Sequence, residues 1–278
     1  MSIIIFTVIL LLGSYFAGLL GSLTGLGGGF VIIPLLTLLL HVDIHYAIGA
    51  SLVSVIATSS GAAAAYVKEG ITNIRLGMFL EIATTAGAFT GAIIAIYIPA
   101  QFIAVLFGII LTFSAVMSLR KKTEQIFHRE TWLSTKLKLG GTYPVNDHQV
   151  EYGVSNIVGG FFMMIFAGII SGLLGIGSGA LKVVAMDGIM RIPFKVSTTT
   201  SNFMIGVTAA ASAVVYLQRG YIHPGLVMPV VIGVLLGAIS GSKILVNANS
   251  SSWLRWIFAI VITLLAAQMI YHGITGKI

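Results

Sequence analysis

The sequence contains no cysteine among its 278 residues, and charged residues make up only 8% of it. Without cysteine, the protein has no disulfides, thiolate nucleophiles, iron–sulfur clusters or cysteine-based zinc sites. Soluble domains carry about 25% charged residues, so this scarcity excludes an ordinary water-soluble domain. Catalytic motifs are also missing, because no GK[ST] follows a glycine-rich segment and no Ser/His/Asp or paired-carboxylate arrangement is legible. We therefore expect neither an enzyme nor a cofactor.

Hydrophobic residues, in contrast, make up 57% of the chain, and the mean hydropathy is +1.04. Apolar runs of about 20 residues recur along the whole length, and each is long enough to cross a hydrocarbon core of about 30 Å. The net charge of +7 comes from basic residues that are scattered or grouped in one loop. That distribution indicates membrane topology rather than nucleic-acid binding. These features predict an all-α polytopic membrane protein that contacts lipid and binds no nucleic acid.

The chain contains an internal repeat at a constant offset of 150 residues. GLGGG at residues 25–29 recurs as GIGSG at residues 175–179, and no gap is needed anywhere. Further matches join Phe16 with Phe166, Ser51 with Ser201, Thr58 with Thr208, Tyr66 with Tyr216, Gly70 with Gly220, Gly87 with Gly237 and Gly91 with Gly241. Because Phe, Tyr and Ser match as well as Gly, composition alone does not explain the offset, and we infer a duplication.

Each half predicts the same series of elements. An apolar stretch (3–22 and 153–173) precedes a glycine-rich break and a second apolar stretch (30–40 and 180–190) that is too short to cross comfortably. We interpret these two stretches as a helical hairpin, either re-entrant or a discontinuous crossing. Three full-length spans follow in each half: 46–67, 76–97 and 101–119, then 196–217, 224–245 and 253–272. The chain thus divides into a first transmembrane repeat (1–119), a linker (120–152) and a second transmembrane repeat (153–278).

The two halves are expected to be inverted relative to each other. The hairpin contributes an even number of net crossings in either form, so each half crosses the membrane an odd number of times. The linker is rich in Lys and Arg and is therefore predicted to be cytoplasmic. The inverted arrangement leaves only Arg219 and Lys277 outside. The basic residues on or near the cytoplasmic side are then Lys68, Arg75, Arg120, Lys121, Lys122, Arg129, Lys136, Lys138, Arg191, Lys195, Lys243 and Arg255.

Within the linker, four apolar residues recur at near-helical spacing among charged residues, and a Gly-Gly pair follows them at residues 140–141. These apolar residues are Ile126, Phe127, Leu133 and Leu137. The pattern predicts a helix that lies on the inner membrane surface, followed by a polar loop, TYPVNDHQ. The linker then serves as a tether between the halves or as a regulatory segment.

The glycine-rich breaks are the predicted substrate site. Unpaired backbone groups survive in a membrane only where they face protein or a water-filled cavity, and duplicated breaks near the midplane usually mark a transporter's binding site. A helix begins after each break, and its free N–H groups and positive dipole end favour an anion. The residues expected to line this site are Gly25, Gly27, Gly28, Gly29, Gly175, Gly177, Ser178 and Gly179. The alternative is that these small residues only let helices pack closely.

Two ionisable residues lie inside predicted membrane segments. Lys182 follows the second break by one turn, where a central lysine costs about 2.5–3.5 kcal/mol on insertion scales. We expect it to add positive charge to the anion site, with snorkelling or pairing with Asp187 as alternatives. Its counterpart in the first half is Ile32. Glu81 is a candidate coupling residue that titrates during transport, and the alternative is a carboxylate that reaches the inner interface or pairs with a base.

Polar side chains cluster where the third element of each half begins. We expect Ser51, Thr199, Ser201 and Asn202 to donate hydrogen bonds to the oxygens of a bound oxyanion. Serine and threonine also bond to carbonyls of their own helix, which is the alternative for each of them.

The segment His41-Val-Asp-Ile-His45 has a spacing that can chelate zinc. The corresponding part of the second half carries Arg191 and Lys195 instead. We therefore interpret these histidines as polar residues at the outer interface and expect no metal.

The chain resembles the TauE/SafE sulfite-exporter family, also called the 4-toluenesulfonate uptake permease family (TSUP), over nearly its whole length. The resemblance rests on GLLGSLTGLGGGFVIIPLL at Gly18 to Leu36, GAS at Gly49 to Ser51 and the Tyr66 to Gly70 region, all echoed in the second half. In the second half, Ser178 stands in place of a glycine and Val184 in place of the proline. The resemblance implies a duplicated, roughly eight-helix carrier of small sulfur-containing anions such as sulfite or organosulfonates.

Taken together, these features predict a secondary transporter that exports a small sulfur-containing anion. The anion binds near the bilayer centre, between two halves that expose it alternately to either side. The alternatives are an anion channel or an uptake permease for another small oxyanion or carboxylate. We expect a multi-pass protein of a bacterial-type inner membrane. One chain is sufficient to enclose the site, and a homodimer is an alternative.

Overall fold

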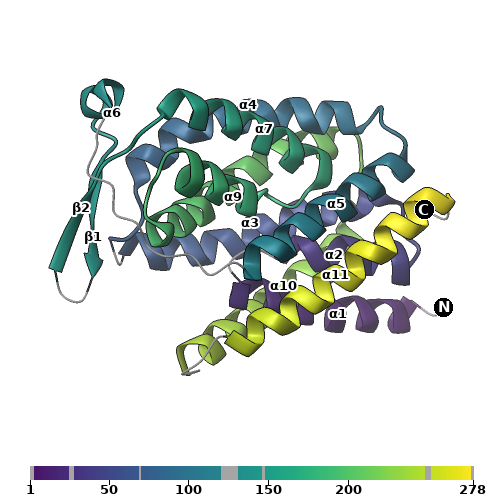
Figure 1. Ribbon diagram of the computed structural model, residues 1–278. Coiled ribbons are helices and arrows are strands. Elements are labelled where there is room, and N and C mark those ends of the chain that lie inside the picture. The colour runs from purple at the N-terminus through teal and green to yellow at the C-terminus, as the bar shows by residue number, and fades with distance from the viewer. Residues whose placement is uncertain are drawn as a thin grey trace.

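The computed structural model describes residues 3–24, 28–68, 70–119, 131–145, 148–247 and 252–276. These ranges are almost entirely helical, and the one sheet within them has two strands (Figure 1). The first half contains α1 (Ile3–Thr24), α2 (Gly29–Pro34), the π-helical η1 (Leu35–Leu39), α3 (Ile44–Lys68), α4 (Ile74–Ala95) and α5 (Ala100–Leu119). The second half contains α7 (Ile157–Leu174), α8 (Gly179–Val183), the π-helical η2 (Val184–Ile189), α9 (Phe194–Gln218), α10 (Pro224–Asn247) and α11 (Ser252–Thr275). Each predicted stretch is confirmed to within a few residues.

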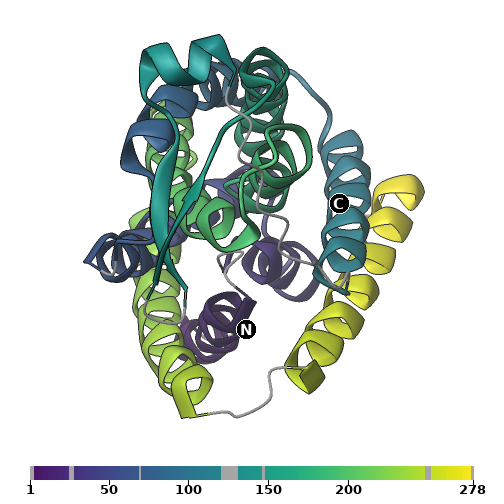
Figure 2. The ribbon, with the colours of Figure 1, turned by 60° about the vertical axis from the view of Figure 1, so that its left-hand side comes forward.

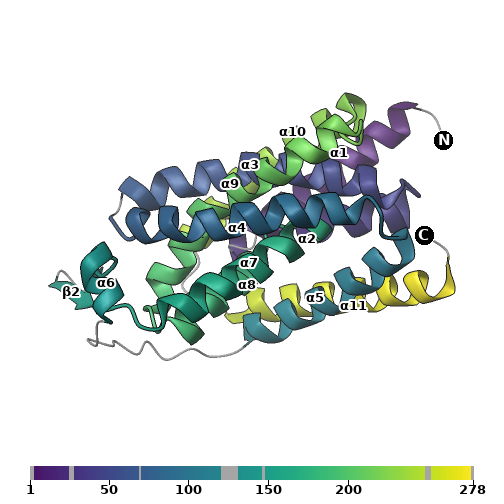
Figure 3. The same cartoon turned by 90° about the horizontal axis from the view of Figure 1, so that it is seen from above.

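The two halves pack against each other through matching pairs of helices. α1 packs along α10, and its repeat counterpart α7 packs along α4. The other two pairs join counterparts directly, α3 with α9 and α5 with α11. Figures 2 and 3 show α5 and α11 side by side. A methyl group on Gly87 would overlap the carbonyl oxygen of Ile165, and one on Gly237 would overlap that of Tyr15. These two contacts are related by the same offset as the sequence repeat. Glycine therefore allows close helix packing at equivalent places in both halves.

The equivalent helices α3 and α9 run in opposite directions. Asn73, which follows α3, donates its backbone N–H to Thr200 Oγ1 in the first turns of α9 at 3.1 Å. At the other end, His45 in the first turn of α3 stacks on Tyr221, which follows α9, with ring centroids 5.2 Å apart. We call the first end the linker end and the second the terminal end, because α6 and β2 lie at one and both chain termini at the other (Figure 3).

The second helical hairpin begins and ends at the linker end. Ser155, which precedes α7, donates its N–H to the carbonyl of Met190, which follows η2, at 3.1 Å. The chain therefore enters through α7, turns at residues 175–178 and returns through α8 and η2. Of the two predicted alternatives, this is the re-entrant one.

The linker contains a short helix, α6 (Trp132–Leu137), and an antiparallel hairpin of β1 (Gly141–Val145) and β2 (His148–Tyr152). The prediction of a polar loop at TYPVNDHQ was wrong. Tyr143 is fully buried and Tyr152 nearly so, and their rings pack edge to face with centroids 5.9 Å apart. The predicted apolar pair at residues 126 and 127 lies outside the described residues, whereas Leu133 packs against a buried cluster.

Six described helices are long and apolar enough to cross a membrane: α1, α4, α5, α7, α9 and α10. Shorter apolar helical stretches occur at Gly29–Leu39, Ile44–Ser60 and Ala259–Thr275. Large apolar side chains point outward along the long helices and the shorter stretches alike. Examples are Ile82 on α4, Phe162 on α7 and Leu264 on α11, which are 66%, 67% and 62% exposed. Such surfaces match the hydrocarbon of a bilayer and not water. The protein is an all-α polytopic membrane protein, as predicted.

Candidate functional site

The second glycine-rich break forms a tight turn between α7 and α8. Gly175 ends α7 with a φ of +66°, and Gly177 and Ser178 follow with φ values of +71° and +46°. Glycine adopts this left-handed region without steric cost, which explains its use at residues 175 and 177. A Cβ on Gly177 would lie 2.7 Å from Ile205 Cγ2, so the turn is also packed tightly against α9. We call residues 175–179 the second tip.

The described part of the first glycine-rich break, Gly28 and Gly29, which we call the first tip, lies against the second tip. Gly25 and Gly27 lie outside the described residues, whereas Gly28 caps α2 and Gly29 begins it. A Cβ on Gly29 would lie 2.6 Å from Ser51 Oγ and 3.4 Å from the carbonyl oxygen of Gly175. Helices α2 and α8 both lie in the middle part of the molecule (Figure 3). The structure therefore brings Gly29 of the first predicted break against the second break, between the linker end and the terminal end.

Two serines that the repeat pairs with each other stabilise the tips. Ser51 Oγ donates to the carbonyl of Gly175 at 2.8 Å, and Ser201 Oγ donates to the carbonyl of Gly179 at 3.2 Å. Both serines are buried. In this conformation their hydroxyl hydrogens pair with the main chain, so they shape the tips and are not free donors for an anion.

Ser178 is different, because its side chain is buried without a partner. It is 2% exposed, and its Oγ makes no hydrogen bond within the described chain. A buried hydroxyl that lacks a partner costs about 1–3 kcal/mol, and at Ser178 it is available as a donor at the tip. The Ser178 carbonyl accepts from the N–H of Lys182 at 3.1 Å, so the two residues are one helical turn apart. The unpartnered hydroxyl thus lies at the start of the short helix that carries Lys182.

Lys182 is paired with Glu81 inside the protein. Its side chain is fully buried, its Nζ donates to Thr208 Oγ1, and Glu81 Oε2 lies 4.0 Å from Nζ. Thr208 in turn donates to Glu81 Oε1 at 2.6 Å, and Thr85 donates to the same oxygen at 3.1 Å. We call these four residues the polar cluster. Snorkelling of Lys182 was a wrong alternative, and its partner is on α4 rather than Asp187.

The polar cluster breaks the repeat. The residues at the same positions of the other half are Ile32 for Lys182, Thr58 for Thr208, Val231 for Glu81 and Leu235 for Thr85. Three of the four counterparts are apolar, although the helices around them pack in the same pairs. The fold therefore does not require charge at this place. The sequence analysis did not include Thr208 or Thr85 among the site residues. The repeat match of Thr208 with Thr58 could have pointed to Thr208.

The polar run at the start of α9 mainly holds the loop between α3 and α4. Thr199 Oγ1 lies 3.4 Å from the carbonyl of Ile71 and 3.1 Å from two carbonyls of its own helix. Thr200 accepts from the N–H of Asn73 at the same loop. Asn202 is buried on α9. The hydroxyl of Thr199 is thus satisfied by the protein, as the alternative interpretation expected.

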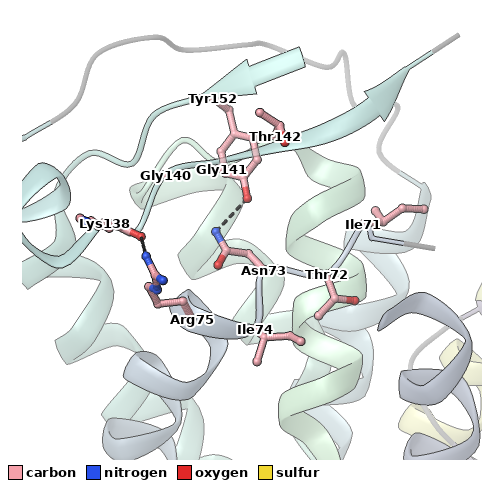
Figure 4. Close-up of a pocket in the computed structure, with 10 residues that line it drawn as sticks. All are labelled: Ile71, Thr72, Asn73, Ile74, Arg75, Lys138, Gly140, Gly141, Thr142 and Tyr152. Carbon is pink, nitrogen blue, oxygen red and sulfur yellow. Dashed lines mark hydrogen bonds between the residues drawn. The ribbon is translucent and has the colours of Figure 1, made fainter. Parts of the chain in front are cut away.

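A cavity of about 280 Å³ lies at the linker end, where the α3–α4 loop meets the linker (Figure 4). The lining includes Arg75, whose Nη1 donates to the carbonyl of Lys138 at 3.2 Å. Asn73 Nδ2 donates to Tyr152 OH at 2.8 Å across it. Burial raises the pKa of Tyr152 to about 12. None of the predicted substrate-binding residues lines this cavity, so it is separate from the tips.

The histidine motif at the terminal end is used for packing. His45 Nδ1 lies 3.1 Å from Asp43 Oδ1, and its Nε2 lies 3.3 Å from the carbonyl of Ala95. The hydrogen bond with His45 lowers the pKa of Asp43. Among the residues that the structure describes, no group of three or more His, Asp or Glu side chains gathers that could hold a metal ion.

A polytopic helical protein whose two halves bring broken hairpins together in its interior has the architecture of a membrane transporter. The family profile of the sulfite exporter TauE/SafE matches residues 10–269, and the chain belongs to this family. It is 29% identical to the "Probable membrane transporter protein YunE" of Bacillus subtilis, with 97% of this chain and 98% of the relative aligned. It is 27% identical to "Probable membrane transporter protein YdhB" of the same organism, over 84% and 89%.

An archaeal relative, "Probable membrane transporter protein MJ0441" of Methanocaldococcus jannaschii, is 25% identical over 87% of this chain and 85% of its own. No solved structure matches the chain significantly. The similarity to bacterial and archaeal membrane transporters thus spans both halves and the linker.

Proposed function

We propose that this protein is a secondary transporter that carries small sulfur-containing anions across the cell membrane by alternating access. The single observation that carries the proposal is the meeting of the two glycine-rich tips beside a fully buried lysine. The substrate binds between the tips, where the N–H groups at the start of the helical segments 29–39 and 179–189 and the unpartnered Ser178 hydroxyl supply hydrogen-bond donors. Membership of the sulfite exporter family favours sulfite and related organosulfonates as substrates and export as the direction.

We infer that the two halves are inverted repeats. The antiparallel course of α3 and α9 and the repeated glycine contacts of Gly87 and Gly237 support this inference. Inverted halves can exchange conformations, so that one arrangement opens the site to one side and the exchanged arrangement opens it to the other. The linker end is proposed to be cytoplasmic because it is basic, with Arg75, Lys138 and Lys195 exposed there. We propose that the membrane is the inner membrane of a bacterial-type cell.

Flux measurements on the purified protein in liposomes test this function. Sulfite, thiosulfate, an organosulfonate and sulfate are supplied in turn, and uptake of labelled anion is measured against a gradient of the unlabelled anion. A carrier gives saturable flux and counterflow, whereas an anion channel gives non-saturating current without counterflow. Absence of flux for every anion overturns the proposal.

A matched pair of variants locates the site. Lys182→Met removes the buried ammonium and is expected to weaken anion affinity by about tenfold to a hundredfold, since a hydrogen bond to a charged group contributes about 1.5–3 kcal/mol. Ile82→Val changes a lipid-facing side chain next to Glu81 and is expected to leave affinity unchanged. Equal affinities for the two variants would remove Lys182 from the site.

A further inference from the structure

We propose that the Glu81 carboxylate pairs with Lys182 when no substrate is bound. A proton must then bind Glu81 when an anion binds Lys182, so that one proton and one monovalent anion bind together and are carried in the same direction. This inference rests on the proposed function and specifies both its coupling ion and the charge of its substrate. The observations that carry it are the geometry of the polar cluster and its absence from the other half.

The first step concerns the two oxygens of Glu81. Oε1 accepts hydrogen bonds from Thr85 and Thr208, whereas Oε2 accepts none from the described residues and lies 4.0 Å from Lys182 Nζ. That distance is beyond hydrogen-bond range. The pair is therefore electrostatic and loosely made, and Oε2 is a buried oxygen without a hydrogen-bond partner, which a proton can occupy.

The second step concerns access. The Glu81 side chain is 9% exposed, whereas that of Lys182 is 0% exposed. The pair therefore has surface only on its Glu81 side, although Oε2 itself is buried, and Lys182 has none. The Thr208 hydroxyl hydrogen has a second acceptor within range, the carbonyl of Met204 at 2.9 Å, so it can leave Glu81 and point back to its own helix. Glu81 can thus release the ammonium without leaving a hydroxyl unpaired.

The third step is charge balance. A buried charge is stable only when it is paired, and removing one partner of a buried pair is strongly destabilising. With Glu81 ionised, the pair with Lys182 is neutral. When a proton from the bulk binds Oε2 and a monovalent anion takes the place of the carboxylate, the cluster is neutral again. A divalent anion would leave one uncompensated negative charge, so the site selects monoanions such as a sulfonate or hydrogensulfite over sulfate.

Other titratable groups on the surrounding elements are far along the chain or already engaged. On α9, Lys195 is exposed at the linker end and the hydroxyl of Tyr216 donates to the carbonyl of Gly172. η2 carries Asp187, five residues after Lys182, and α4 carries Arg75 in its first turn. The sequence of α7 has no titratable residue. Glu81 is therefore the acid that faces Lys182.

The test uses methanesulfonate, because its charge stays at minus one throughout the pH range and substrate titration cannot imitate coupling. In proteoliposomes that contain a pH-sensitive dye, the wild type is expected to move one proton with each methanesulfonate, in the same direction. Its affinity should fall as pH rises from 6 to 8, by at most about tenfold per pH unit, the limit for a single linked proton. Sulfate should compete far more weakly than methanesulfonate.

Variants separate coupling from binding. Glu81→Gln is expected to keep methanesulfonate counterflow, with an affinity that no longer depends on pH and without proton movement. In detergent, methanesulfonate should raise the unfolding temperature of Glu81→Gln, because the anion supplies the missing charge, but not that of Lys182→Met. Thr58→Val, at the repeat counterpart of Thr208, is the control and should retain wild-type pH dependence.

Flux in the wild type without proton movement or pH dependence would overturn the exchange of partners while leaving transport itself established. Competition by sulfate as strong as that by methanesulfonate would overturn the single-charge selectivity. Absence of any anion flux would instead refute the proposed function. The wild-type proton measurement requires no variant, so poor folding of Glu81→Gln does not prevent the test.

Discussion

The pair of Lys182 and Glu81 makes a quantitative prediction about stability. At 4.0 Å and an effective dielectric constant of about 20, two unit charges attract by about 4 kcal/mol. Breaking a buried pair by removing one partner costs about 3–5 kcal/mol, which agrees in size. Lys182→Met and Glu81→Gln are each expected to lose about this much free energy of unfolding. For a chain of this length the loss corresponds to a fall of about 10 °C in unfolding temperature.

The double variant Glu81→Gln/Lys182→Met distinguishes pairing from simple packing. It carries no buried charge, so it should recover more than half of the stability lost by either single variant, which makes the two effects strongly non-additive. Ile32→Met, at the repeat counterpart of Lys182, controls for the introduced methionine and should cost less than about 1.5 kcal/mol.

The assay is thermal unfolding in detergent, followed by the intrinsic fluorescence of the three tryptophans, since the chain has no cysteine for a thiol-reactive dye. All variants are compared without substrate anions. If the single variants unfold at the wild-type temperature, or if the losses simply add in the double variant, the two charges do not stabilise each other in the folded protein.

Two further predictions concern packing and the linker. Gly87→Ala places a methyl group against the carbonyl of Ile165 and should destabilise the protein by about 1–3 kcal/mol in the same assay. The control is Gly188→Ala, which should cost much less stability because its methyl group would meet only one carbon atom, at 3.9 Å. Tyr152→Phe removes the acceptor of the 2.8 Å bond from Asn73, which should loosen the linker by about 1 kcal/mol and speed its cleavage in limited proteolysis. Because burial raises the pKa of Tyr152 to about 12 from 10.0, the neutral phenol stabilises the docked linker fully below pH 10. In the wild type this contribution should be lost as pH rises from about 10 to about 12, and in Tyr152→Phe that change in cleavage rate should be absent.

The membrane helices could be predicted from the sequence because their cause is local. A run of apolar residues as long as the bilayer is thick predicts a helix without reference to the rest of the chain. The repeat then predicted the short segments 30–40 and 180–190, and the structure has them at 29–39 and 179–189, each as a short α-helix followed by a π-helix. The linker hairpin was missed because its polar residues outweighed two alternating pairs with high strand propensity, Tyr143 and Val145 in β1 and Val150 and Tyr152 in β2.

The partners of the polar side chains could not be predicted, since they depend on which helices meet. Glu81 and Lys182 lie on α4 and α8, and no spacing rule relates residues so far apart. The hydroxyls of Ser51 and Thr199 likewise have carbonyl partners on other elements, Gly175 and Ile71. A serine that binds a ligand and one that holds a loop have the same sequence signature, because both expose the same donor.

The asymmetry of the polar cluster is the strongest argument that its charges serve function rather than folding. Both halves share the helix pairing and the glycine contacts, so the first half is an internal control for what the scaffold needs. That control has Ile32 and Val231 where the charged pair would be. Charges inside a membrane protein cost free energy even when paired, and apolar residues of similar volume are often equally or more stabilising. A pair that is present in one half and absent from the other is thus not required by the scaffold, and the proposed exchange gives both charges a role in binding the proton and the anion.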